Sequence, residues 1–147
     1  MEVKPRLVLK TALSILELVF RAIYPPKGTK EQLKYKQRRF GFMVALLILK
    51  AHELGFECVI GDAAFSCMLN KVGKPEGDLL AKTLGHRKNS NHFLCLAVDL
   101  ELFFDGRYLT ETSDHEPLGE YWMSLGGAWG GDFNDGNHYS LEHNGVK

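Results

Sequence analysis

The stretch LCLAVDLELFFDGRYL, residues 94–109, decides the fold of this chain. Along its first half, leucine and valine alternate with small or acidic residues, which is the period-two pattern of a strand that buries one face. The Asp105-Gly106 pair favours a tight turn that sends the chain back as a second strand. We therefore predict an antiparallel hairpin whose first strand covers 93–103, with Asp99 and Glu101 on the face opposite the core.

Two helices are predicted on the N-terminal side of this hairpin. Apolar residues recur at helical spacing over 7–24, and Pro25 ends that helix because proline cannot continue it. Thr29 and Gln32 form a capping-box pattern, which predicts that a second, strongly apolar helix begins at Thr29, and Gly55 closes it. The other predicted elements are a strand over 56–60, a long connection over 61–89, a helix over 116–125 and a final strand over 138–141.

Together, the length and the pattern predict one α+β domain, 1–147, in which a small antiparallel sheet packs against N-terminal helices. Residues 1–30 are expected to form an N-terminal helix and linker, and residues 31–147 the core of the domain. A hydrophobic content of 45% is ordinary for a globular protein and argues against disorder.

Charge and cysteine content exclude some classes of protein. Lys plus Arg and Asp plus Glu both number 18, so the chain offers no basic field for nucleic acid. Charged residues break the apolar runs near the N-terminus, which are shorter than the roughly 20 residues that span a bilayer, so neither stable membrane insertion nor an export signal is expected. Three cysteines without a CxxC pair predict reduced thiols and a cytoplasmic protein.

Two short segments contain residues that can bind a metal: Ser90 to Asp99, with His92 inside it, and Asp135 to His138. Two histidine nitrogens and one carboxylate oxygen around Zn²⁺ leave a fourth position for water, which is typical of a catalytic site. A second acid could accept the proton of that water. Taken singly, each residue also has a structural explanation, such as a hydrogen-bonded histidine, a solvated carboxylate or an Asx turn.

The spacing of His92 and Asp99 sets a condition on this site. Seven residues apart in one straight strand, the two side chains would point to opposite faces of the sheet. Joint ligation therefore requires a bend before the strand, and the run Asn89-Ser90-Asn91 favours one.

The segments SNHFLCLAVD (90–99) and DGNHYS (135–140) resemble the SxHxxGxAxD and (D/E)xxH motifs of the D-alanyl-D-alanine carboxypeptidase-like zinc peptidases. This group includes phage endolysins that cut the L-alanyl–D-glutamate bond of peptidoglycan. The likeness runs from about residue 31 to 142 and is weakest over 61–89. The resemblance implies a sheet that carries a Zn²⁺ site. Its ligands would be His92, Asp99 and His138, with Asp135 as the general base.

Two departures from the family pattern concern the neighbourhood of this site. Cys95 stands where the motif has glycine, a change that should be tolerated because the side chain is small and faces the cleft. Relatives also have an arginine after the early strand, whereas residues 61–66 contain none, and losing such a donor typically costs about 10²–10³ in rate. His86 and Arg87 are candidates to replace it, and together with Ser90 they are the predicted substrate contacts.

The resemblance implies a zinc endolysin that hydrolyses a bond of the peptidoglycan stem peptide, L-Ala–D-Glu, through a metal-bound water. We expect it to act as a monomer. Without a signal peptide, it would wait in the host cytoplasm and reach the wall after the membrane is permeabilised. One alternative is a D-Ala-D-Ala carboxypeptidase or dipeptidase. Another is a zinc-containing virion or binding protein whose catalysis has decayed.

Overall fold

The computed structural model describes residues 5–25, 32–61 and 90–147. The predictions for the long connection, His86 and Arg87 included, lie outside these ranges. The described elements follow one another as α1 (Pro5–Ile23), α2 (Leu33–Leu54), β1 (Glu57–Ile60), β2 (Ala97–Phe104), β3 (Arg107–Leu109), the 3₁₀ turn η1 (Thr112–His115), α5 (Glu116–Ser124), β4 (Ala128–Trp129), the 3₁₀ turn η2 (Gly130–Phe133) and β5 (His138–Ser140).

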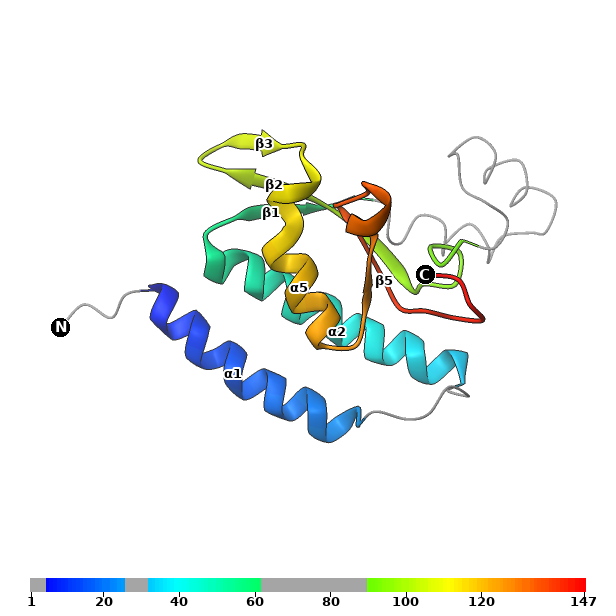
Figure 1. The fold of residues 1–147 in the computed structure, drawn as a ribbon. Coiled ribbons are helices and arrows are strands. Elements are labelled where there is room, and N and C mark those ends of the chain that lie inside the picture. The colour runs from blue at the N-terminus through cyan, green and yellow to red at the C-terminus, as the bar shows by residue number, and fades with distance from the viewer. Residues whose placement is uncertain (1–4, 26–31, 62–89) are drawn as a thin grey trace, which may run out of the picture.

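Strand β2 is the centre of the antiparallel sheet (Figure 1). One of its edges pairs with β1, whereas the other pairs with β5 near its start and with β3 near its end. The last strand, β4, pairs with β5. The turn between β2 and β3 is Asp105-Gly106, both with positive φ, so the predicted hairpin is confirmed.

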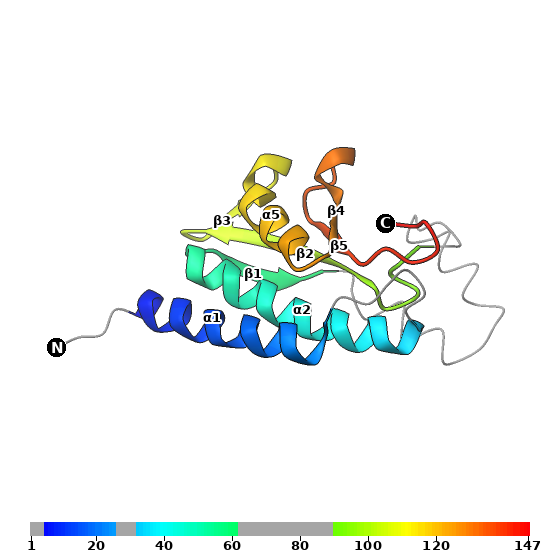
Figure 2. The ribbon, with the colours of Figure 1, turned by 60° about the horizontal axis from the view of Figure 1, so that its bottom comes forward.

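Helix α2 packs on this sheet, and α1 packs along α2 (Figures 1 and 2). The core lies between α2, α5 and the buried face of β2. Its fully buried side chains include Met43, Leu47, Val98, Leu100, Leu102 and Trp122. The predicted fold class, α+β with N-terminal helices packed on a small antiparallel sheet, is therefore confirmed.

The ends of α2 show one correct prediction and one error. Gly55 closes the helix in the left-handed conformation, at φ 94°, as predicted. The predicted start at Thr29 is wrong, because α2 begins at Leu33 with Gln32 as its N-cap, and the Gln32 side chain makes no capping hydrogen bond. Leu33 already packs against the core, so tertiary contact rather than the capping box decides where this helix begins.

Strand β2 starts later than its alternating pattern suggested. It begins at Ala97 rather than 93, because residues 91–95 form a tight turn. Within the strand the predicted alternation holds: Leu100 is fully buried, while Asp99 and Glu101 are half-buried on the other face.

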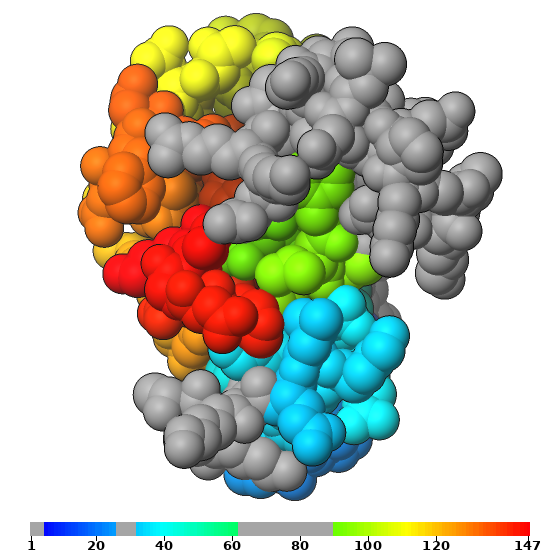
Figure 3. Space-filling view, turned by 90° about the vertical axis from the view of Figure 1, so that its right-hand side faces the viewer, coloured from blue at the N-terminus to red at the C-terminus, as the bar shows by residue number. Residues whose placement is uncertain are grey.

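The segment after β5 runs back beside the N-terminal end of α2 (Figure 3). The Lys36 ammonium donates a hydrogen bond to the Glu142 carbonyl at 2.6 Å. The side-chain amide of Asn91 donates to the carbonyls of Leu141 and Val146, at 3.1 and 2.9 Å. This segment therefore connects α2 to the turn that precedes β2.

None of the helices in the part of the chain that the structure describes is long and apolar enough to cross a membrane.

Candidate metal site

Asp99 and His138 are brought together by the sheet. They are direct partners in the antiparallel register of β2 and β5, so their side chains stand next to each other on one face. His138 Nδ1 lies 3.0 Å from Asp99 Oδ1. Residues 39 positions apart in the chain thus become neighbours through backbone pairing.

His92 reaches the same place from the turn before β2. The backbone N–H of Cys95 donates to the His92 carbonyl at 3.1 Å, and the N–H of Leu96 donates to the Asn91 carbonyl at 2.9 Å. The Ser90 hydroxyl accepts the backbone N–H of His92 at 3.3 Å, which gives Ser90 a role in shaping the turn. The predicted bend is therefore confirmed, and it turns a buried His92 towards β2 and β5.

Three ligand atoms converge at this point. His92 Nε2 lies 3.2 Å from His138 Nδ1 and 3.4 Å from Asp99 Oδ1, in addition to the 3.0 Å contact between Asp99 and His138. Each of the two nitrogens carries at most one proton, and two protons cannot make good hydrogen bonds along all three sides of a triangle. A cation at its centre would satisfy all three atoms.

The dimensions of the triangle fit zinc. Tetrahedral ligands at roughly 2.0–2.1 Å from Zn²⁺ lie about 3.3 Å apart, close to the three separations of 3.0, 3.2 and 3.4 Å. His92, Asp99 and His138 are thus a group that could hold a metal ion. The side chains of His138 and Asp99 keep 17% and 24% of their surface exposed, so the site is accessible from their side.

Electrostatics keep the carboxylate of this group ionised. Burial works to raise the pKa of Asp99, but the hydrogen bonds and charges of His138 and His92 outweigh it and lower that pKa to about 2. A metal requires a deprotonated carboxylate and neutral imidazoles. Asp99 meets this requirement throughout the neutral pH range.

Asp135, the predicted general base, lies beside this group along the chain. Its backbone N–H donates to the Gly130 carbonyl, and its own carbonyl accepts the N–H of His138, both at 3.1 Å. A Cβ at Gly130 would collide with the Asp135 carbonyl, so this close approach requires glycine. Asp135 is exposed and does not belong to the three-residue group, so its catalytic role stays a prediction.

Two residues that sequence reasoning did not identify hold the loop around Asp135. The Trp129 indole N–H donates to the Gly136 carbonyl at 2.7 Å, and its ring lies where a side chain at Gly131 would be. Thr112 packs against the backbone of Gly136 from η1. Gly131, two residues after Trp129, was the available signal, since a glycine can indicate the close approach of a large ring.

Cys95, the residue in place of the motif's glycine, has φ 53°, within the left-handed region that glycine adopts most easily. Backbone conformation is therefore a stronger reason for glycine at this position than the small side chain that the sequence suggested. Cys95 is disulfide-bonded, whereas Cys58 is free. The prediction of reduced thiols is therefore wrong for Cys95. An odd cysteine count leaves at least one thiol without a partner but does not prevent a pair from forming.

Comparison with known proteins gives one match. Residues 84–141, less than half of the chain, match the sequence model of the D-alanyl-D-alanine carboxypeptidase family. No curated protein and no solved structure matches the chain. The matched segment contains His92, Asp99 and His138, and it is this part of the chain that supports a place in the general family of D-alanyl-D-alanine carboxypeptidases.

Proposed function

We propose that this protein is a zinc-dependent peptidase that hydrolyses the stem peptide of bacterial peptidoglycan. The observation that carries the proposal is the convergence of two imidazole nitrogens and one carboxylate oxygen within 3.4 Å of each other. The match to a family of D-alanyl-D-alanine carboxypeptidases over the same residues supports a peptide substrate of the cell wall.

His92, Asp99 and His138 would hold the metal, with the carboxylate neutralising part of its charge. Zn²⁺ in such a site lowers the pKa of water from about 15.7 to about 7 and polarises the scissile carbonyl. The sheet register fixes Asp99 beside His138, and the turn at 91–95 fixes His92, so the chain supplies the ligands already arranged.

Asp135 would move the proton. Exposed and three residues before His138, it would accept the proton of the attacking water and pass it to the leaving amine. Its backbone N–H donates to the Gly130 carbonyl and its carbonyl accepts the N–H of His138; these bonds support the role, because they restrain its position relative to a proposed ligand. Ser90, with its hydroxyl on the turn of His92, is the described candidate for substrate contact.

For the bond that is cut, we propose L-Ala–D-Glu, as in phage endolysins. The motif likeness at 90–99 and 135–140 supports this choice. The catalytic domain would be residues 31–147, acting as a monomer without nucleic acid. The protein would wait in the host cytoplasm until the membrane is permeabilised. Removal of terminal D-alanine is the second candidate, because the matching family is named for it.

The test is mass analysis of soluble fragments from purified peptidoglycan, digested with and without a chelator and after zinc is restored. New N-terminal D-glutamate would support the endolysin reaction, whereas free D-alanine would assign the carboxypeptidase reaction. Stoichiometric zinc without any cleavage would overturn the enzymatic proposal in favour of a binding protein. In the same assay Asp135→Asn should lose cleavage. The matched control is Asp132→Asn, in the same exposed loop, which should keep it.

A further inference from the structure

The apolar residues of helix α1 cover a wide arc of its circumference, but only part of that arc is buried. Leu13 and Phe20 are buried against the rest of the protein. The outward side exposes six large apolar residues: Leu7 (61%), Val8 (53%), Ile15 (56%), Leu18 (70%), Val19 (40%) and Ile23 (55%). Large exposed apolar faces usually mark interaction sites, so this face calls for a partner.

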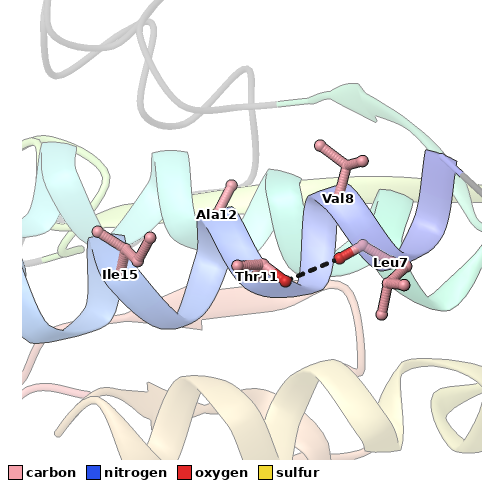
Figure 4. Close-up of a pocket in the computed structure, with 5 residues that line it drawn as sticks. All are labelled: Leu7, Val8, Thr11, Ala12 and Ile15. Atoms are coloured by element: carbon pink, nitrogen blue, oxygen red, sulfur yellow. Dashed lines mark hydrogen bonds between the residues drawn. The ribbon is translucent and has the colours of Figure 1, made fainter. Parts of the chain in front are cut away.

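These six residues form one continuous face, which we call the outer face of α1. At about 100° per residue they fall within an arc of roughly 160° centred near Ile15. Val8, Thr11 and Ala12 line a shallow pocket on its first half, together with Leu7 and Ile15 (Figure 4). The face runs the length of a helix that lies along the outside of α2 (Figures 1 and 2).

The exposed charges of α1 all have the same sign. Lys10 and Arg21 are exposed and lie on one flank of the outer face. Arg6 is also exposed, but it lies on the opposite side of the helix, beside Gly55 at the end of α2. The one acid of the helix, Glu17, is half-buried. The chain as a whole has a formal net charge of zero, so this local excess is a property of the helix. The outer face is therefore complementary to a surface that is apolar inside and anionic at its boundary.

We propose that α1 binds the surface of an anionic lipid bilayer, lying in the interface with its outer face towards the acyl chains. A wide apolar face with basic residues beside it is typical of interfacial helices, whose lysines and arginines reach back to the head groups. The proposed mode is peripheral, since no described helix could cross a bilayer. The proposal does not rest on the peptidase function, because α1 contains no residue of the metal group.

A second copy of the chain suits this face less well. In an antiparallel pair of α1 helices related by a two-fold axis, each flank meets the same flank of the other copy. The flank that carries Lys10 and Arg21 would then lie along the same basic flank of the other copy, and like charges side by side are unfavourable.

The experiment measures sedimentation of the full chain, loaded with zinc, with vesicles of phosphatidylcholine alone or with 30% phosphatidylglycerol. We expect the partition coefficient to be at least tenfold higher on the anionic vesicles. Ile15→Ser combined with Leu18→Ser should lower it at least tenfold. The matched control is Val59→Ser with Met123→Ser, at positions exposed by 50% and 48% on other elements, which should leave it unchanged.

Charge reversal tests the electrostatic part: Lys10→Glu with Arg21→Glu should abolish the preference for anionic vesicles. Circular dichroism and zinc content, expected to be unchanged in all variants, show that each protein is folded. The proposal is overturned if the native chain does not bind anionic vesicles. It is also overturned if the Ile15→Ser with Leu18→Ser variant and the Lys10→Glu with Arg21→Glu variant both bind as the native chain does. It is also overturned if analytical ultracentrifugation shows a dimer that Ile15→Ser with Leu18→Ser dissociates. Cleavage of peptidoglycan is measured separately, and its result neither supports nor contradicts membrane binding.

Discussion

The turn before β2 and the helix α1 depart from ordinary burial in opposite directions. His92 and Asn91 are each only 2% exposed, although both are polar, whereas Leu18 of α1 is 70% exposed. Buried polar side chains generally have hydrogen-bond partners, as the Asn91 amide nitrogen and His92 Nε2 do here. Large apolar side chains that are exposed together generally mark a surface that something else covers. The contacts that the turn already makes therefore indicate its role, whereas the outer face of α1 indicates that a partner is still to be found.

Loss of a ligand should have the largest effect on the buried region. His92→Ala removes one corner of the triangle, and we expect zinc affinity to fall by more than about 100-fold, because even the loss of a residue that only orients a ligand costs 10–100-fold. Competition with a chromophoric chelator measures this. His52→Ala, at an exposed histidine on α2, is the control. An unchanged zinc affinity in His92→Ala would show that His92 is buried for a reason other than metal binding.

Asp135→Asn should act on hydrolysis alone. The amide cannot accept the proton, so we expect peptidoglycan cleavage to fall by about 10²–10⁴ while zinc affinity stays the same. Rates of fragment release and metal content are measured on the same samples. A rate within threefold of the native protein would remove Asp135 from the mechanism and make Asp132 the acid to test.

Trp129→Phe should have a moderate effect, because it keeps a smaller aromatic ring at this position but removes the donor to the Gly136 carbonyl. A half-buried acceptor that loses its partner typically costs about 1–3 kcal/mol. We expect a lower free energy of unfolding in urea and a kcat that falls more than KM rises, since the loop of Asp135 loosens. If stability and kcat both remain native, the hydrogen bond does not hold this loop.

The smallest expected effect is on the pH dependence of stability. Burial lowers the pKa of His115 below its usual 6.5, and the charge of Asp114 offsets this only in part. Below about pH 6.5 the unfolded chain therefore binds a proton that the folded protein does not, and the free energy of unfolding falls as pH falls towards the folded pKa. His115→Gln should reduce the difference in urea midpoint between pH 7 and pH 5. An equal difference in both proteins would assign the acid sensitivity to other groups.

Local sequence signals predicted the parts of the fold that local physics decides. The Asp105-Gly106 hairpin, the left-handed Gly55 and the bend that contains His92 are all confirmed, because each depends on a few neighbouring residues. The start of α2 was missed because packing of Leu33 overrides the capping pattern. Strand β4 was missed because it is two residues long and exists only through its pairing with β5.

The orientation of α1 shows the limit of periodicity. A helix over these residues was predicted from apolar spacing, but that spacing did not say which side would be covered, and the structure exposes Ile15 and Val19. A helix with apolar residues on two sides has no single preferred face in its sequence, and contact with α2 decides between them. For the metal group, the residue types were readable from the sequence, but the register that pairs Asp99 with His138 was not.

The two hydrogen bonds of the Asn91 amide have a practical consequence for anyone who prepares this protein. They attach the turn of His92 to the carbonyls of Leu141 and Val146, so the segment 141–146 acts as a brace for one proposed ligand. An affinity tag fused directly after Lys147 could strain these hydrogen bonds, and a truncation before Val146 would remove one of them. Metal content should therefore be compared between differently tagged preparations before a low occupancy is attributed to the site itself.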